Sequence, residues 1–139
     1  MTARLGLVLV FAASLGLVAA AATAAGATSP PQPSSAPALA KLIAAKGLNC
    51  RDFQGQQSGG TCTVGHEFDV ALEVFASKAQ LAKTLPKQSS QICQQERQAH
   101  STQPVVYVIG PNWVAAFESQ ANARPLAKAL HAKTKTLSC

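Results

Sequence analysis

The sequence predicts a small α+β domain: an antiparallel sheet with helices packed on one face, built from two ββα internal repeats and held by two disulfide bonds. Three observations lead to this prediction. The chain of 139 residues matches itself at an offset of 45 residues, its predicted strands alternate apolar with polar side chains, and it carries four cysteines. Such alternation is typical of an antiparallel sheet with one buried face, so we expect a layer of helices on that face.

The first 27 residues have the pattern of a secretory signal peptide. A basic start that ends at Arg4 precedes the apolar run Leu5 to Val18, and small residues follow in Ala25-Gly26-Ala27. Signal peptidase requires small residues before its cut, so we expect cleavage after Ala27, with Ala24 as the alternative. An uncleaved membrane anchor is a further alternative, because the apolar stretch is just long enough to span a bilayer. The sequence has no twin arginine, so we expect the general secretory route and a secreted, extracellular or cell-envelope location.

Residues 28–37 predict a Pro/Ser-rich spacer, and residues 38–139 predict a single α+β domain. The spacer contains four prolines and three serines, and no charged side chain. Proline lacks a backbone donor and favours extended polyproline conformations, which suit a linker. Residues 38–46 then predict a first helix that ends at Gly47.

The four cysteines predict two disulfide bonds, Cys50–Cys62 and Cys93–Cys139. An even number of cysteines in a small exported chain is typical of disulfides, although the sequence alone allows three connectivities. The first pair would close a short loop through a Gly-rich stretch, and the second would tie the last residue to the middle of the chain. A zinc or redox role requires closely spaced ligands such as C-x-x-C, which the sequence lacks.

The self-match pairs two segments that each predict a strand, a turn, a strand and a helix. The corresponding residues are Gly65 and Gly110, Phe68 and Trp113, Leu72 and Phe117, Glu73 and Glu118, Ser77 and Asn122, and Leu85 and Leu130. Turns are expected at Gly65-His66 and at Gly110-Pro111-Asn112, because these residues are favoured in tight turns. The predicted order of elements is α-β-β-β-α-β-β-α.

The alternation predicts which strand residues face the core. In the first copy the inward side chains are those of Phe68, Val70, Leu72 and Val74, and the outward ones those of Glu67, Asp69, Ala71 and Glu73. In the second copy Trp113 and Phe117 point inward, so Phe68 and Trp113 are expected in equivalent buried positions. Tyr107 and Ile109 would share the face of Trp113. A second apolar strip would lie on the other face and be exposed, meet a partner or form a dimer edge: Val106, Val108, Val114 and Ala116.

Cap residues predict where the two later helices begin. Ser77 is expected as the N-cap of the first, with Gln80 completing a capping box. Asn122 is expected as the N-cap of the second, which would place Pro125 in the first turn, where proline is tolerated.

Two further features of these helices are expected. Pro86 is predicted to interrupt the middle helix and to leave residues 87–99 as a second segment or a loop. The last helix is predicted to continue to about Leu137, with Lys135 on a basic stripe and Lys133 beside it.

The run Val105 to Ser119 (VVYVIGPNWVAAFES), the LAKAL of Leu126 to Leu130 and the late Cys139 resemble small uncharacterised exported proteins of high-GC Gram-positive bacteria. The resemblance covers about a third of the chain without its signal segment. Its motifs are structural. It therefore implies a compartment and a fold, and no catalytic or binding residue.

His66, Glu67 and Asp69 cluster at a predicted turn and are the first candidates for metal binding or acid–base chemistry. A solvated turn has the same composition, and no second set of ligands accompanies them, so no metal or other cofactor is expected. A hydrolase would need a nucleophile turn such as G-x-S-x-G, which the sequence lacks. Glu73 and Glu118 are expected at equivalent outward positions. No catalytic residue is predicted.

The charge balance bears on the partner. Without residues 1–27 only Arg4 is lost from the 12 basic side chains, so 11 remain against 6 acidic ones. A net charge of about +5 favours weak attraction to anionic envelope polymers or lipid head groups. Nucleic-acid binding is not expected, because the protein is exported and no aromatic residues interleave with its charges.

We therefore expect an exported, non-enzymatic small binding or envelope-associated protein. Its partner is expected to be an unknown protein or an anionic envelope polymer, and a homodimer is a further option. It would meet the membrane only through the signal peptide during export. The alternative is a small secreted, hydrolase-like enzyme with an unrecognised site.

Overall fold

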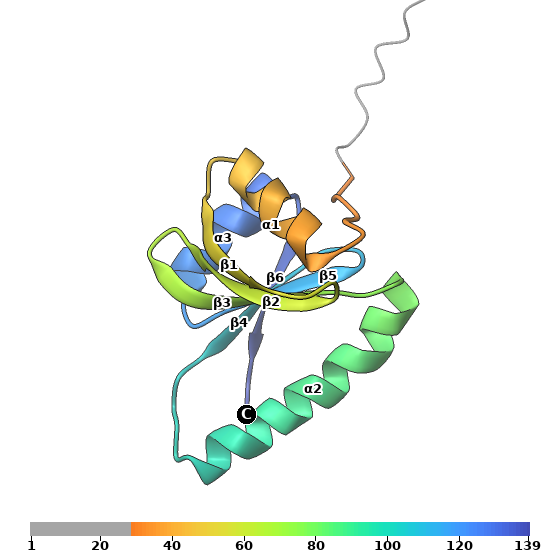
Figure 1. Cartoon of the computed structure of the whole chain (residues 1–139). Coiled ribbons are helices and arrows are strands. Elements are labelled where there is room, and N and C mark those ends of the chain that lie inside the picture. Colours follow the sequence, from red (N-terminus) through yellow and green to blue (C-terminus); the bar gives the residue numbers. More distant parts are fainter. Residues whose placement is uncertain (1–28) are drawn as a thin grey trace, which may run out of the picture.

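The computed structural model describes residues 29–139, which form a six-stranded antiparallel sheet and three helices (Figure 1). The helices are α1 (Ala36–Ala45), α2 (Lys78–Gln98) and α3 (Gln120–Ala129). The strands are β1 (Cys50–Gly55), β2 (Gly59–Val64), β3 (Glu67–Val74), β4 (Val105–Ile109), β5 (Trp113–Phe117) and β6 (Lys133–Leu137). The predicted signal peptide, residues 1–27, lies outside the described residues. The predicted α+β class is confirmed.

The sheet has the strand order β1-β2-β3-β5-β4-β6, and every neighbouring pair is antiparallel. β3 and β5 meet in the middle, where Val74 pairs with Trp113 and Ala71 pairs with Ala116. This pairing joins the first three strands to the last three. β1 and β6 are the edge strands.

Helices cover both faces of the sheet, which corrects the predicted arrangement on one face. α1 lies over β1, β2 and β3, and α3 lies over β4, β5 and β6, on what we call the α1/α3 face. α2 crosses the opposite side, the α2 face (Figure 1). The main core, on the α1/α3 face, includes Leu39, Ile43, Leu72, Trp113, Phe117, Leu126 and Leu130. A smaller cluster on the α2 face contains Phe75, Leu81, Leu85, Tyr107 and Val114.

A β-bulge in β3 makes the predicted burial of Phe68 wrong. Cys62 pairs with Val70, but Val64 pairs with Glu67, so β3 has one more residue than β2 between these two pairs. An extra residue reverses the alternation of side chains beyond it. Glu67 therefore turns inward and is 8% exposed, whereas Phe68 is 75% exposed. Trp113 is 0% exposed, as predicted, so the two aromatic residues are not equivalent.

The side chains of β4 lie on the opposite faces from those predicted, because the turn between β4 and β5 is one residue longer than expected. Ile109 pairs with Val114, so four residues separate the paired positions, one more than the predicted turn Gly110-Pro111-Asn112. Directly paired residues share a face of the sheet. The side chains of Val106 and Val108 consequently join Trp113 in the main core, and those of Tyr107 and Ile109 lie on the α2 face.

The start of α2 is the predicted one. The Ser77 hydroxyl accepts a hydrogen bond from the Gln80 amide at 3.1 Å. The Gln80 side chain accepts one from the amide of Ala76 at 2.9 Å, one residue before the cap. Pro86 does not interrupt α2, which is a single helix of 21 residues. Its first half is packed through Leu81 and its second half is tied to the C-terminus by a disulfide, and these anchors hold the helix across the proline.

The start and end of α3 both differ from the prediction. Ser119 is the N-cap, and its hydroxyl accepts a hydrogen bond from the Ala121 amide at 3.2 Å. Asn122 and Pro125 therefore lie inside the helix. The helix ends at Ala129, and His131 takes a left-handed φ of 51°, which reverses the chain. The following residues, including Lys133 and Lys135, form β6 beside β4 rather than more helix.

Both predicted disulfides are present in the structure. Cys50–Cys62 joins β1 to β2 with a Cα–Cα distance of 5.4 Å. Cys93–Cys139 joins α2 to the last residue with a Cα–Cα distance of 5.0 Å. The first bond fastens an edge strand, and the second fastens the second half of α2.

The end of the predicted spacer packs onto the domain. We call residues 29–35 the N-terminal arm. The indole Nε1 of Trp113 donates to the Pro31 carbonyl at 3.0 Å, and the Asn112 side chain donates to the Pro33 carbonyl at 2.8 Å. α1 begins at Ala36, two residues before the predicted domain boundary, and Ser35 is its N-cap. The arm is thus hydrogen-bonded to the turn that precedes β5 and to the first residue of β5.

Candidate functional site

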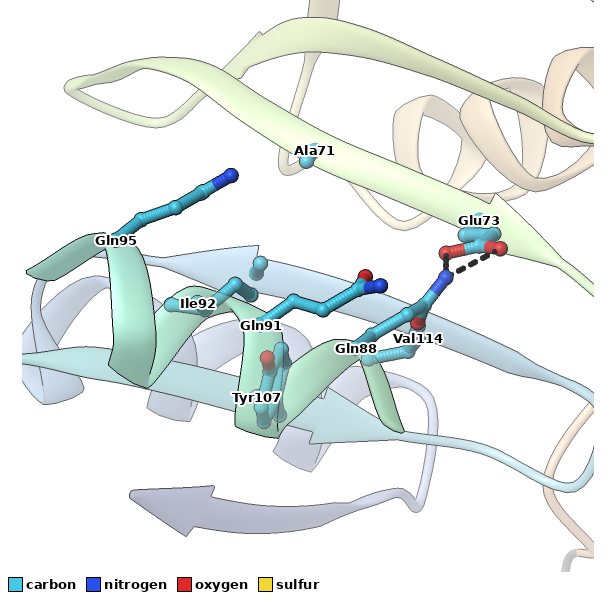
Figure 2. Close-up of a pocket in the computed structure, with 9 residues that line it drawn as sticks. Ala71, Glu73, Gln88, Gln91, Ile92, Gln95, Tyr107 and Val114 are labelled. Atoms are coloured by element: carbon cyan, nitrogen blue, oxygen red, sulfur yellow. Dashed lines mark hydrogen bonds between the residues drawn. The ribbon is translucent and has the colours of Figure 1, made fainter. Parts of the chain in front are cut away.

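A groove lies between α2 and the α2 face of the sheet (Figure 2). We call it the α2 groove, and its volume is about 260 Å³. The sheet contributes Ala71 and Glu73 from β3, Tyr107 from β4, and Val114 and Ala116 from β5, while α2 contributes Gln88, Gln91, Ile92 and Gln95. The floor is therefore mostly apolar and the helical wall mostly carboxamide.

The residue types explain why α2 leaves this space. Its first half carries leucines that pack on the sheet, but its second half turns Gln88, Gln91 and Gln95 toward the sheet at a spacing that keeps them on one helical face. Opposite them, Ala71 and Ala116 are small and fill little volume. Figure 2 shows the Gln91 and Gln95 side chains extending from α2 across the gap. Polar side chains facing small ones do not close into a dry core.

One end of the groove is bridged by a hydrogen bond between α2 and β3. The Gln88 amide nitrogen donates to both carboxylate oxygens of Glu73, at 3.0 and 2.9 Å (Figure 2). Glu73 is half-buried, which differs from its predicted outward position. The bridge fixes the carboxylate and one glutamine in place.

Tyr107 supplies an unpaired polar group at the floor of the groove. The side chain is 4% exposed, and its hydroxyl has no hydrogen-bond partner among the described residues. A buried hydroxyl without a partner costs about 1–3 kcal/mol. Because the oxygen atom itself is covered, a ligand group in the groove can bond to it and recover that energy only after a side chain of the groove has moved.

The chemistry of the groove suits recognition. It offers carboxamides, one phenol and one carboxylate, and the described residues that line it include no serine, cysteine, histidine or lysine. A nucleophile with an adjacent base is the usual requirement for acyl transfer. The Glu73 carboxylate already accepts two hydrogen bonds from Gln88.

The residues predicted as the first candidates lie elsewhere, at the β2–β3 turn. The Glu67 carboxylate accepts hydrogen bonds from the backbone amide of Glu118 and, at 2.9 Å, from the side chain of Asn122. It therefore ties β3 to the segment that leads into α3. His66 and Asp69 are exposed beside it. Within residues 29–139 no group of three or more His, Cys, Asp or Glu side chains is placed to hold a metal ion.

The groove was not predicted from the sequence, because the residues that form its walls were assigned to the wrong faces of the sheet. Tyr107 was expected on the face of Trp113, and Glu73 was expected outward. The glutamines at positions 88, 91 and 95 were visible as a polar run in the sequence. Their spacing along one helical face is the signal that could have placed them together.

The chain matches no protein-family model, no curated protein sequence and no solved structure. Within the described part of the chain, no helix is both long and apolar enough to cross a membrane. Two disulfides fit an oxidising, extracellular environment.

Proposed function

We propose that this chain is an exported, non-enzymatic binding protein and that the α2 groove holds a short, uncharged segment of a partner protein. The single observation that carries this proposal is an open groove whose floor contains Tyr107, with an unpaired hydroxyl that is covered until a side chain of the groove moves. Native proteins rarely leave such a group unsatisfied without a functional reason.

The shape and the polar groups of the groove favour a peptide. From Gln88 to Gln95 the helix rises by about 10 Å, which is the length of about three residues of extended chain. Carboxamides pair with both the N–H and the C=O groups of such a chain. The volume of about 260 Å³ suits a few residues of a larger partner rather than a whole drug-sized molecule. Glu73 disfavours an anionic polymer in this groove.

Selection of phage-displayed random peptides on the purified, oxidised protein tests the groove. We expect enriched peptides whose binding is lost in Ala71→Trp, because Ala71 is exposed in the groove and tryptophan would fill it. Ala121→Trp is the matched control, because Ala121 is exposed on α3, on the opposite face. Peptides that bind Ala71→Trp as well as the parent would contradict the proposal, and so would hydrolysis of the bound peptide, which would indicate an enzyme.

Tyr107→Phe gives a second, independent readout. Removal of an unsatisfied buried hydroxyl is expected to raise the free energy of unfolding by about 1 kcal/mol while it weakens peptide binding. Urea unfolding measures the first effect and a peptide titration the second. A variant that is less stable and binds peptide normally would show that the hydroxyl serves the fold.

The proposal includes export through the signal peptide of residues 1–27. The two disulfides support an oxidising compartment, and the resemblance to exported proteins of high-GC Gram-positive bacteria supports the same route. We expect the exported protein to begin at Thr28, which intact mass measurement checks. A product that retains residues 1–27 in the membrane fraction would overturn this part of the proposal.

A further inference from the structure

A second concave site lies at one end of the sheet, away from the α2 groove. It is formed where the start of α2, the β4–β5 turn and the α3–β6 turn meet the N-terminal arm, and its volume is about 410 Å³. In Figure 1 the arm, the start of α2 and the β4–β5 turn lie on the same side of the molecule. We call this site the basic hollow.

The rim of the basic hollow carries three basic side chains from separate parts of the chain. Lys78 is the first residue of α2, His131 lies in the turn after α3, and Lys133 begins β6. None of the described residues that line the hollow is acidic. Basic groups that converge from different elements without a carboxylate among them favour an anion.

The interior of the basic hollow is apolar. Leu81 and Ala82 line it from α2, Ile109 from the end of β4, and Ala132 from the residue before β6. Ile109 packs against the smaller hydrophobic cluster and Ala132 against the main core, so the hollow lies where the two clusters meet. An occupant must therefore combine an apolar body with an anionic end.

The walls of the hollow are held in place by the fold. Lys78 and Leu81 belong to the capped first turn of α2, and the Ala132 amide donates to the Ala127 carbonyl at 2.9 Å. Gly110 lies against the Trp113 indole so closely that a Cβ atom would overlap the ring. Trp113 is the only tryptophan of the chain, so its fluorescence can report what happens at this wall.

We propose that the basic hollow binds a free single-chain amphipathic carboxylate, such as a fatty acid anion. The carboxylate meets Lys78 and Lys133, and the alkyl chain lies on Leu81, Ala82 and Ile109. The volume falls within the range of small-molecule sites, roughly 300–1,000 Å³. This site is independent of the α2 groove and of the peptide proposed there.

Titration of the purified, oxidised protein with decanoate tests the proposal, with Trp113 emission and calorimetry as readouts. We expect saturable binding at one site. Decan-1-ol lacks the charge and should bind about fivefold more weakly or worse, because it loses the attraction of two exposed lysines. Acetate lacks the chain and should not bind detectably. Equal binding of decanoate and decan-1-ol would overturn the proposal.

Two double variants remove the same charge from the same elements. Lys78→Gln/Lys133→Gln removes both lysines of the rim and should weaken decanoate binding about fivefold or more. Lys83→Gln/Lys135→Gln also changes one lysine of α2 and one of β6, but neither residue lines the hollow, so binding should be unchanged. All four lysines are exposed, so both proteins should fold. Equal losses in the two variants would show a nonspecific charge effect and contradict the proposal.

Two single variants and a vesicle assay distinguish the basic hollow from the α2 groove and from a membrane-binding surface. Ala82→Glu places an acidic side chain at the wall and should abolish decanoate binding. Ala71→Trp fills the α2 groove and should leave decanoate binding unchanged. Binding to phosphatidylglycerol vesicles without binding to decanoate would assign the site to a membrane surface and overturn the free-ligand proposal.

Discussion

At the scale of single residues, Glu67 shows how one inserted residue changes the chemistry of a strand. Asp69 adopts a left-handed φ of 55° within the bulged part of β3, and the side chain of Glu67 then reaches the α1/α3 face. There its carboxylate accepts hydrogen bonds from the Glu118 amide and from Asn122. A buried carboxylate needs such partners. At this end of β3 the sequence predicted that Phe68 would face the core. In the structure Glu67 faces it instead and forms polar contacts with α3 and with the segment that leads into it.

The same bulge separates Trp113 from Phe68 in their contribution to stability. Trp113→Ala should lower the free energy of unfolding by about 3–5 kcal/mol, because it removes the largest fully buried side chain. Phe68→Ala should change it by no more than about 0.5 kcal/mol, because Phe68 is exposed. Urea unfolding of the two variants measures the difference. Similar losses for both would place Phe68 in the core and contradict the bulged register.

At the scale of elements, the capping signals placed the start of α2 correctly but not the start of α3. Ser77 and Gln80 cap α2 as expected, because capping depends on residues three apart. The predictions that Pro86 interrupts α2 and that Asn122 caps α3 were wrong. In the structure α2 is anchored by a disulfide and Asn122 bonds to Glu67, and these long-range contacts could not be read from the local sequence. β6 was missed for the same reason: its exposed Lys133 and Lys135 become a strand by pairing with β4.

The Cys93–Cys139 bond should be the main anchor of the second half of α2. The bond spans 46 residues, so Cys93→Ser/Cys139→Ser should lower the free energy of unfolding by about 2–4 kcal/mol. Amide exchange should accelerate in residues 87–98, because the glutamine-rich half then loses its covalent tie.

Cys50→Ser/Cys62→Ser is the matched control for that variant. It removes the other bond, which spans 12 residues in β1 and β2. It should also destabilise the protein but should leave the relative protection of residues 87–98 unchanged. Exchange in α2 that responds equally to both variants would mean that the helix is held by the sheet as a whole.

At the scale of the whole molecule, the placement of α2 decides both the fold and the candidate site. The α+β class was predicted from the alternation, and the structure contains the disulfide pairing that was favoured among the three that the sequence allows. The face of α2 could not be predicted, because its polar sequence carries only three large aliphatic residues, Leu81, Leu85 and Ile92, to mark a buried side. The groove could not be predicted without that face. The superposition of the two halves as ββα units stays a prediction, and the placement of α2 and α3 on opposite faces of the sheet does not favour it.

The N-terminal arm should contribute to the stability of the domain although it was predicted as a spacer. A chain that begins at Ser34 lacks Pro31 and Pro33, and it leaves Trp113 Nε1 and one bond of the Asn112 side chain unsatisfied. We expect a loss of about 1–3 kcal/mol in unfolding free energy, measured by urea unfolding. A chain that begins at Ser29 keeps both contacts and should match the chain that begins at Thr28. Equal stability of all three would show that these two hydrogen bonds are exchanged for bonds to water at no cost, and the arm would then act as a linker.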